Sequence, residues 1–442
     1  MTRRRVMTWD GGVWRGLGIS RGISQRSGPP ISYARRPDDT SGRNLRPLDG
    51  RKRGRAPYGT GAKGARARPA IEGAIMSLPV RLLYLVSHPI QYQAPLLARL
   101  AAEPGIALRV VFGRTDTEGG YFDSGFGVRL AWDVPLRQGY DSVALAETDL
   151  RTEILKADVV WLHGWGSSML LRALALAKVE GRPVLMRGEN QDQAMPDGKG
   201  LRGWAKRRFL NWVFARTAAF LAIGSANRDY YLRRGVAPEQ VFHVPYAVDN
   251  AAFAAGAAAA DLAGLRRELG IPEDSQVVLF AGKFQRRKRP DLLLDAWERM
   301  AAPRPVLLMV GDGEMRAELE ARRATGIVFA GFRNQSELPA LYAMADAFVL
   351  PSESEPWGLA VNEAMACGTA IVVSDQVGAA RDLVDAGCGA VFPAGDAQAL
   401  AQALSRVLAH SQEMGRAAAS RIATWDFEAD LAGLREALAH VR

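Results

Sequence analysis

The chain has few cysteines and no long apolar run. Its 442 residues include only two cysteines, Cys367 and Cys388, and no C-x-x-C spacing. This excludes a disulfide framework and a cysteine zinc site, and it is the usage expected in a reducing cytoplasm. No stretch reaches the roughly 18 apolar residues that a membrane-spanning helix needs. Hydrophobic residues still make up 48% of the chain, which is enough for the buried cores of two or three domains of roughly 100–200 residues each.

An excess of positive charge is absent from most of the chain. The net charge is +10, but residues 1–75 hold 17 Lys and Arg against 5 Asp and Glu. Residues 76–442 therefore hold 40 basic and 42 acidic side chains. Because this larger part is nearly neutral, the sequence gives no reason to expect that it binds nucleic acid.

Residues 1–75 form a basic extension rich in Arg, Gly, Pro and Ser, without apolar periodicity. Such a composition cannot offset the entropy lost on folding, so we expect this extension to be disordered. It could be an arm for nucleic acid or anionic lipid, or an Arg-rich transit peptide. Since Met76 stands directly before the first strand-like run, we favour a true start at Met76 and a misassigned extension.

Short apolar runs alternate with amphipathic stretches from residue 76 onward, which predicts parallel sheets with helices on both faces. We therefore expect an α/β protein with two doubly wound, Rossmann-like domains, at 76–250 and 271–420. An alanine-rich linker at 251–270 would join them, and a helix at 421–442 could pack back on the first domain. The carboxyl ends of both sheets would face a ligand-binding cleft. The runs predicted as strands are 81–87, 108–113, 158–164, 183–189, 218–225, 276–283, 305–313, 326–332, 346–352, 369–375 and 389–395.

The loop after the first strand of the second domain is strongly basic. Lys283 closes that strand and Lys288 precedes a helix that starts at Pro290. Cations beside a helix N-terminus suit a diphosphate, although a solvated basic loop is the alternative. Gly311, in the following G-x-G turn, either serves the turn itself or allows a nucleotide to approach the backbone.

The segment PSESEPWGLAVNEAMACG (351–368) holds two glutamates with a proline between them. Because Pro356 does not suit a helix interior, we expect a helix from Gly358 or Leu359 to about Gly368. Glu355 then lies in the loop before the helix and Glu363 in its second turn. The free N–H groups at Gly358 and Leu359 would bind an anion between the two carboxylates. This order suits a nucleotide sugar, with hydroxyl groups at both ends and a diphosphate in the middle.

Residues 277–395 resemble the retaining glycosyltransferases of family 4, which have the GT-B fold. The resemblance lies in AGKFQRRKRPDLLLDAW, VLLMVGDGEMRAELE and the two glutamates followed by AMACG. It implies that Glu355 contacts the donor sugar and Glu363 the ribose. It further implies that Lys283 and Lys288 bind the diphosphate, together with the amides of Gly358 and Leu359. Lys283 departs from the family, which more often has arginine there, so bidentate phosphate binding is lost at this position.

The first domain resembles the family more loosely. In DVVWLHGWG (158–166) a strand ends at His163, which the resemblance places against the donor sugar, while a structural histidine is the alternative. The first loop, SHPIQYQAPLL (87–97), lacks the glycine pair of many relatives. We expect five side chains from this loop and from RGEN (187–190) on the acceptor side of the cleft, namely His88, Gln91, Tyr92, Arg187 and Glu189.

The segment GLRGWAKRRFLNWVFAR (200–216) mixes cations with aromatic residues. Such a helix can lie on an anionic membrane surface, or it can pack on the sheet of its own domain. The arc that favours the membrane surface consists of Leu201, Trp204, Ala205, Phe209, Trp212 and Val213, with Arg208 among them.

The sequence thus predicts a glycosyltransferase that uses a nucleotide sugar, UDP- or GDP-linked, with a glycan, lipid or small-molecule acceptor. We expect no cofactor and no metal, since no D-x-D follows a strand of the second domain, and no nucleic-acid partner. The resemblance implies retention of configuration and a place in polysaccharide or cell-envelope synthesis, in the cytoplasm or on the inner membrane face. The alternatives are a GT-B epimerase or phosphorylase, and a non-catalytic nucleic-acid-binding protein acting through the basic extension.

Overall fold

The computed structural model describes residues 8–10, 13–15, 78–116, 120–123, 125–192 and 196–442. The chain forms two units, residues 1–77 and 78–442, which we describe separately. In the first unit, β1 (Thr8–Asp10) and β2 (Val13–Arg15) pair antiparallel. The rest of the basic extension, with the disorder expected there and the proposed start at Met76, lies outside the described residues.

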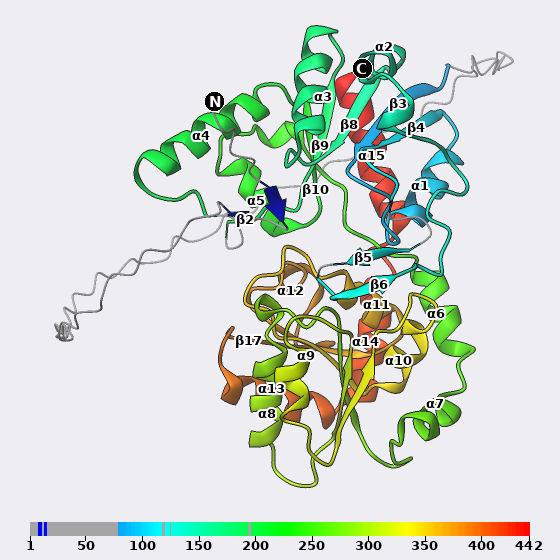
Figure 1. The fold of residues 1–442 in the computed structure, drawn as a ribbon, viewed down its shortest axis with the longest axis vertical. Helices are drawn as coiled ribbons and strands as arrows, with labels where there is room; N and C mark the ends of the chain where they lie inside the picture. Colours follow the sequence, from blue (N-terminus) through cyan, green and yellow to red (C-terminus); the bar gives the residue numbers. More distant parts are fainter. Residues whose placement is uncertain (1–7, 11–12, 16–77, 117–119, 124, 193–195) are drawn as a thin grey trace, which may run out of the picture. The chain divides into compact units, whose positions relative to one another are not determined.

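Residues 78–250 contain a parallel sheet of seven strands in the order β11-β10-β9-β8-β3-β4-β7 (Figure 1). Helices flank this sheet, and together they form the N-terminal lobe. Its strands are β3 (Val80–Val86), β4 (Ile106–Phe112), β7 (Asp141–Ala144), β8 (Val159–His163), β9 (Val184–Arg187), β10 (Ala219–Ala222) and β11 (Val241–His243). Its main helices are α1 (Ala94–Ala101), α2 (Leu150–Lys156), α3 (Ser168–Val179), α4 (Gly200–Phe214) and α5 (Ser225–Leu232).

Residues 250–422 form the C-terminal lobe, whose parallel sheet has six strands in the order β14-β13-β12-β15-β16-β17. Its strands are β12 (Val277–Ala281), β13 (Val306–Val310), β14 (Ile327–Gly331), β15 (Ala347–Leu350), β16 (Ala370–Ser374) and β17 (Gly389–Phe392). Its helices are α6 (Asn250–Ala258), α7 (Leu262–Leu269), α8 (Pro290–Arg299), α9 (Arg316–Glu320), α10 (Leu338–Met344), α11 (Leu359–Ala366), α12 (Ala380–Leu383), α13 (Ala397–Leu408) and α14 (Ser411–Ile422).

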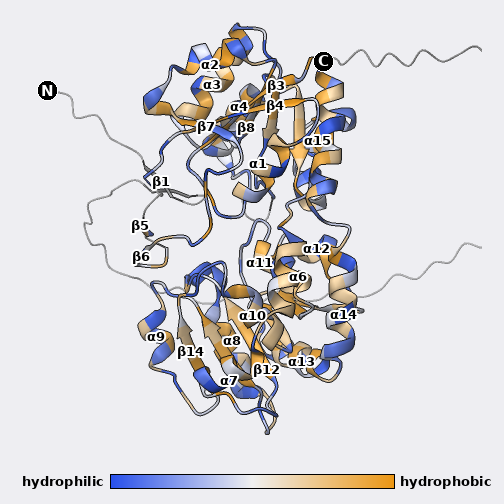
Figure 2. Cartoon of the chain, turned by 90° about the vertical axis from the view of Figure 1, so that its right-hand side faces the viewer, coloured by the Kyte–Doolittle hydropathy of each residue, from blue (hydrophilic) through white to orange (hydrophobic). Residues whose placement is uncertain are grey.

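Both sheets are buried on both faces. Each contributes to two separate clusters of apolar side chains, one on either side of its strands. Figure 2 shows the same pattern, with hydrophobic strands inside and mixed helix surfaces outside. Strands buried on both faces read as continuous apolar runs, and every run predicted as a strand is one. The predicted fold class is therefore confirmed.

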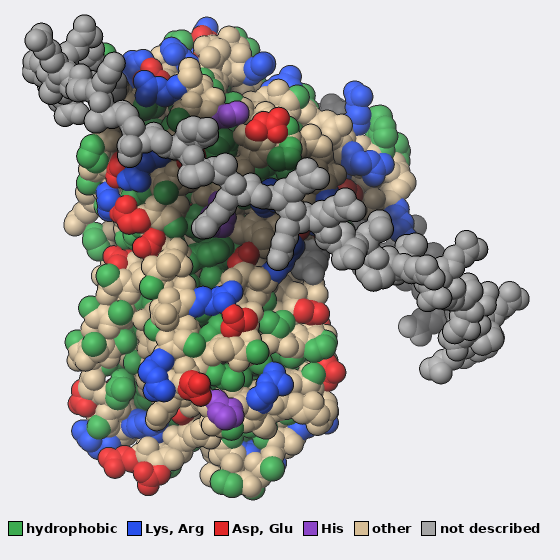
Figure 3. Space-filling model, turned by 180° about the vertical axis from the view of Figure 1, so that it is seen from behind, with side chains coloured by type: hydrophobic (Ala, Val, Ile, Leu, Met, Phe, Trp, Pro, Cys, Tyr) green, Lys and Arg blue, Asp and Glu red, His purple; other side chains and the backbone are tan. Residues whose placement is uncertain are grey.

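The surface of residues 78–442 is electrically mixed. Figure 3 shows Lys and Arg interspersed with Asp and Glu on the visible part of one face. Among the described residues, no helix combines the length and apolar character that crossing a membrane requires.

The segment expected as a linker, 251–270, is mostly helical. It contains most of α6 and all of α7, whose first turns are capped by Asp249 and Asp261. Helix α6 packs on α10 and α11, and Phe253 is buried in the core of the C-terminal lobe. Alanine is the strongest helix former, so an alanine-rich stretch with a capping aspartate at its start favours a helix over a flexible connection.

The end of the chain returns to the N-terminal lobe. After α14 the chain crosses over and forms α15 (Phe427–Val441), which packs on β10 and β11. Its apolar face joins the core of that lobe through Leu431, Leu434, Ala437 and Leu438. Gly433 permits this packing, since a Cβ there would lie 1.8 Å from the carbonyl oxygen of His243.

A buried ion pair joins α15 to the sheet. The guanidinium of Arg187 lies 2.7 Å from the carboxylate of Asp430, and their side chains are 3% and 1% exposed. Arg187 also donates to the carbonyl oxygens of Val244 and Pro245, at 3.2 and 3.0 Å. We expected Arg187 on the acceptor side of the cleft, but its contacts are inside the lobe. A buried guanidinium requires a carboxylate partner, and here α15 supplies it.

Removing that partner tests the role of the pair. We expect Asp430→Ala to lower the free energy of unfolding by about 3–5 kcal/mol, because Arg187 would remain buried without a counter-charge. Glu428→Ala on the same helix removes an exposed pair with Arg99 and should leave stability unchanged. Denaturant unfolding of the full chain measures both, and equal effects would contradict the structural role of Asp430.

Candidate active site

The loop before α11 carries the first of the two glutamates. Helix α11 begins at Leu359, directly after Gly358, and Gly368 follows its end, as predicted. Gly358 has φ 96°, and a Cβ there would lie 2.9 Å from Leu350. The turn therefore requires glycine, and it places the first N–H groups of α11 beside the loop that holds Glu355.

Glu355 is paired with two cations of the basic loop. Lys288 Nζ lies 2.6 Å and Arg287 Nη1 3.2 Å from its Oε2 atom. Burial alone would raise the pKa of Glu355, but the charges of Lys288 and Arg287 outweigh it and hold the pKa below its ordinary value. The sequence predicted Glu355 and Lys288 as ligands of neighbouring parts of one donor, and the structure brings them into direct contact.

Glu363 lies in the second turn of α11 and is buried. The hydroxyl of Tyr342, on α10, donates to its Oε2 atom at 2.7 Å. Burial raises the pKa of Glu363, and the bond from Tyr342 offsets only part of this. No sequence pattern indicated a role for Tyr342, because its position is that of an ordinary core residue of an amphipathic helix.

Lys283 follows the end of β12 and is also paired. Its Nζ atom lies 2.8 and 3.0 Å from the carboxylate oxygens of Asp123, and 4.9 Å from the ring centre of Phe126. Both partners belong to the N-terminal lobe, on or beside β5 (Tyr121–Asp123). The cation predicted to bind diphosphate is therefore engaged by a carboxylate of the opposite lobe.

Asp123 and Phe126 belong to a hairpin of β5 and β6 (Val128–Leu130) that contacts the ends of the C-terminal strands. The rings of Phe126 and Phe332 lie 5.1 Å apart, and Asn334 Nδ2 donates to the carbonyl oxygen of Ala131 at 2.8 Å. The sequence analysis missed this hairpin, because it has neither a long apolar run nor a clear alternation.

Gly311 is needed for close packing. A Cβ at this position would lie 1.9 Å from the carbonyl oxygen of Gly282, and φ is 134°. Its amide donates to the carbonyl oxygen of Gly331 at 2.8 Å. The structural alternative considered for Gly311 therefore holds, while its contact with a donor stays a prediction.

His163 ends β8 between two tyrosines. Tyr84 Oη lies 2.8 Å from its Nδ1 atom and Tyr246 Oη 3.0 Å from its Nε2 atom. Burial, with small additions from the charges of Arg187 and His88, lowers the pKa of His163 to about 3. The imidazole is therefore neutral near pH 7 and cannot exchange protons there as an acid–base catalyst.

Tyr246 joins several parts of the site. Its hydroxyl donates to Glu189 Oε1 at 2.8 Å, so its oxygen can accept a hydrogen bond from Nε2 of His163. Its carbonyl oxygen accepts from Asn362 of α11 at 3.0 Å and from Trp425 of the C-terminal crossing at 2.8 Å. Tyr246 thus connects the N-terminal lobe, the helix of Glu363 and the returning chain.

The remaining residues predicted for the acceptor side are only partly brought together. The ring of Tyr92 lies 6.2 Å from that of Tyr246, which also binds Glu189. His88 Nδ1 lies 2.8 Å from Ser87 Oγ, and burial lowers the pKa of His88. Gln91 is half-buried in the turn before α1.

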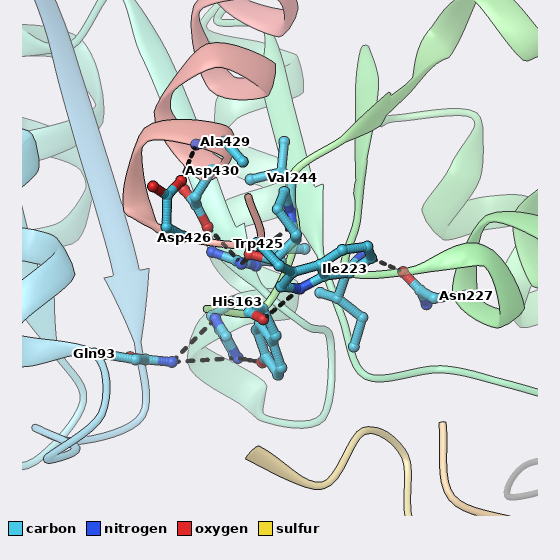
Figure 4. Close-up of polar contacts among 12 residues, drawn as sticks. Gln93, His163, Ile223, Asn227, Val244, Trp425, Asp426, Ala429 and Asp430 are labelled. Atoms are coloured by element: carbon cyan, nitrogen blue, oxygen red, sulfur yellow. Dashed lines mark hydrogen bonds and ion pairs between the residues drawn. The ribbon is translucent and has the colours of Figure 1, made fainter. Parts of the chain in front are cut away.

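Sequence reasoning missed the neighbouring Gln93, whose amide nitrogen lies 3.4 Å from Nδ1 of His163 (Figure 4).

The lobes contain two cavities, and the second is lined by Gln191, Val377 and Gly378, which contact the backbone of Glu355. One of about 610 Å³ is lined by residues including Arg289 and Asp396, and one of about 510 Å³ by residues including Gln191 and Arg381. Neither Glu355 nor Glu363 lines them. Within the described part of the chain, no three His, Cys, Asp or Glu side chains are grouped so that they could hold a metal ion.

Two family models match the chain. One, described as "Glycosyl transferase 4-like domain", matches residues 89–247, and the other, "Glycosyl transferases group 1", matches residues 263–422. The chain belongs to the GT-B glycosyltransferases of the family 4 type. The resemblance found in residues 277–395 is thereby confirmed and extends over the N-terminal lobe.

Relatives in sequence include several named D-inositol 3-phosphate glycosyltransferase. The one from Geodermatophilus obscurus is 34% identical over 217 residues, which are 45% of this chain and 46% of the relative. The one from Catenulispora acidiphila is 31% identical over 262 residues, 54% of this chain and 60% of the relative. The chain spans about half the length of the curated relatives it matches.

Solved structures share the fold. The crystal structure of Anabaena Alr3699/HepE in complex with UDP-glucose matches with a TM-score of 0.59 at 17% identity, over 81% of this chain and 99% of that one. A glycosyltransferase from Rickettsia africae matches with a TM-score of 0.65 at 13% identity, over 82% of this chain and 98% of that one. The two-lobed GT-B fold that the resemblance implied is therefore confirmed.

The pair of Lys283 and Asp123 generates a test. A donor diphosphate that binds Lys283 must compete with the carboxylate, so we expect Asp123→Asn to tighten nucleotide binding by about three- to tenfold. Asp116→Asn is the matched control, since Asp116 pairs only with nearby Arg114 among the described residues. Titration calorimetry with UDP and GDP measures both variants. If Asp123→Asn binds each nucleotide no more tightly than the control, Asp123 does not compete with the donor.

Proposed function

We propose that this glycosyltransferase transfers a sugar from a UDP- or GDP-sugar to a glycan or lipid-linked acceptor. The observation that carries the proposal is the contact of Glu355 with Lys288 beside the N-terminus of α11. The contact brings three kinds of group together at the start of α11. They are a carboxylate that can accept hydrogen bonds from sugar hydroxyls, a cation that can bind phosphate, and free backbone N–H groups. The structural match to HepE, whose structure contains UDP-glucose, supports a nucleotide-sugar donor.

Donor binding would replace ion pairs and hydrogen bonds within the protein with equivalent contacts to the donor. Glu355 is ionised and held by Lys288 and Arg287. A diphosphate would take the cations, and the sugar hydroxyls would donate to the released carboxylate. Glu363, held by Tyr342, would accept from the ribose hydroxyls one turn further along α11. Exchange of this kind keeps every buried charge compensated as the donor enters.

We propose that transfer proceeds with retention and without a metal. The bond from the anomeric carbon to the phosphate oxygen breaks, and the acceptor oxygen bonds to that carbon on the same face. The acceptor proton passes to the departing phosphate oxygen. Lys288 and the N–H groups of Gly358 and Leu359 would stabilise the charge on the diphosphate. This route assigns no proton transfer to His163, whose pKa is lowered by burial.

A donor panel tests the proposal directly. We expect a UDP- or GDP-sugar to raise the melting midpoint of the full chain, because a ligand that binds only the folded state stabilises it. We also expect transfer only when an acceptor is supplied. A panel in which no nucleotide or nucleotide sugar shifts the midpoint would overturn the proposal. Conversion of a donor without any acceptor would indicate an epimerase instead.

Substitutions of the two glutamates should differ in their effects on nucleotide affinity and on kcat. Loss of a charged hydrogen-bond acceptor for ribose should make Glu363→Ala bind free nucleotide about ten- to a hundredfold more weakly. Glu355→Gln should lower kcat about a hundredfold with little change in nucleotide affinity. Calorimetry and initial rates measure both effects.

A matched control and a second variant complete this experiment. Glu353→Gln alters an exposed neighbour that pairs with Arg289 and should change neither quantity. Glu363→Gln keeps an acceptor for Tyr342, which separates ribose binding from loss of stability. Equal effects of the two main variants on free-nucleotide affinity would contradict the assigned roles.

A further inference from the structure

Helix α4 presents an apolar face to solvent at the edge of the N-terminal lobe (Figure 1). Its packed side consists of Gly203, Leu210 and Val213. Leu201, Trp204 and Phe209 are 79%, 54% and 38% exposed. Trp212 and Phe214, near the end of α4, pack partly on the core of the lobe, whereas Leu201, Trp204 and Phe209 belong to none of the apolar clusters of the two lobes.

The helical period explains this division. At about 100° per residue, Gly203, Leu210 and Val213 cluster on one side of α4. Leu201, Trp204 and Phe209 lie on the opposite side, with Trp212 between them. The rings of Phe209 and Trp212 stack with centroids 6.4 Å apart and planes inclined by 16°. Of the predicted arc, Val213 belongs to the packed side and Trp212 is partly buried against the same core, so the outward side consists of Leu201, Trp204, Ala205 and Phe209.

Cations surround this aromatic surface. Arg202, Arg207 and Arg208 are exposed, and none forms an ion pair within the part of the chain that the structure describes. Arg208 lies 5.7 Å from the ring centre of Trp204, and Arg216 lies 4.3 Å from that of Trp212. The sequence has no Asp or Glu from 198 to 228. Within the described residues, the charge of these three arginines is therefore not neutralised by an ion pair.

We propose that α4 docks the protein on the surface of a membrane that contains anionic phospholipids. Tryptophan and phenylalanine favour the boundary between headgroups and acyl chains, and arginine can reach lipid phosphates while its stem covers apolar surface. The charge is complementary to an anionic surface. A symmetric pair of chains fits poorly, because a twofold contact would place the same arginines against each other.

Vesicle co-sedimentation of the full chain tests the proposal. We expect binding to vesicles of phosphatidylglycerol and phosphatidylcholine, weaker binding to phosphatidylcholine alone, and a loss of binding as salt rises. The double variants Trp204→Ser/Phe209→Ser and Arg207→Glu/Arg208→Glu should each bind the anionic vesicles about tenfold or more weakly.

Matched controls separate α4 from other parts of the chain. Val179→Ser alters an exposed apolar residue on α3. Arg406→Glu/Arg416→Glu makes the same change of charge on exposed positions of the C-terminal lobe. Both controls should bind vesicles like the unaltered chain, and all four variants should keep its melting midpoint, since the altered residues are largely exposed.

The outcomes are distinct. If the α4 variants bind vesicles as well as the controls do, the proposal is wrong, and another part of the chain binds the vesicles. If they change only the oligomeric state in solution, the surface binds a second copy and the proposal also fails. The assay needs no nucleotide sugar, so its result is independent of the donor panel. Membrane docking would favour a lipid-linked acceptor, an extension that rests on the proposed function.

Discussion

The candidate site depends on compensation of buried charge. Glu355 can remain ionised although it is buried because Lys288 and Arg287 contact it, since an unpaired buried carboxylate would be strongly disfavoured. The same contact fixes the loop before α11 and thereby the position of the first helical N–H groups. Carboxylate, cations and helix terminus are consequently arranged together before any ligand binds.

Two further ion pairs differ in burial, and burial decides whether the two charges of a pair can be separated. Arg187 and Asp430 are 3% and 1% exposed, so separating them would leave two charges without water or partner. That pair holds α15 on the N-terminal lobe. Lys283 and Asp123 are 31% and 12% exposed, and solvent can compensate either charge when the other leaves. The first pair is therefore structural, whereas the second can exchange with a ligand phosphate.

The features that could be predicted from the sequence are those that depend on the local pattern of residues. Continuous apolar runs gave the strands, and Pro356 with Gly358 gave the start of α11. The contacts that sequence reasoning missed join distant segments. Arg187 and Asp430 are 243 positions apart, and Asp123 and Lys283 are 160 apart. No periodicity in either segment indicates such a partner. The helices within 251–270 were not predicted for a different reason, because composition was weighed above the capping aspartates that start both of them.

Helix α4 shows the limit of periodicity most clearly. The arc of Leu201, Trp204 and Phe209 is visible in the sequence, but period alone cannot tell whether an apolar face meets the core or solvent. The structure decides this through the residues opposite the arc, since Gly203 and Leu210 are small or aliphatic enough to pack closely while Trp204 stays outside. A solvent-facing aromatic surface costs free energy unless something covers it. Arg202, Arg207 and Arg208 beside it form no ion pair within the part of the chain that the structure describes, so their charge favours an anionic partner. An anionic bilayer surface offers both shallow insertion of apolar side chains and contact with phosphate groups.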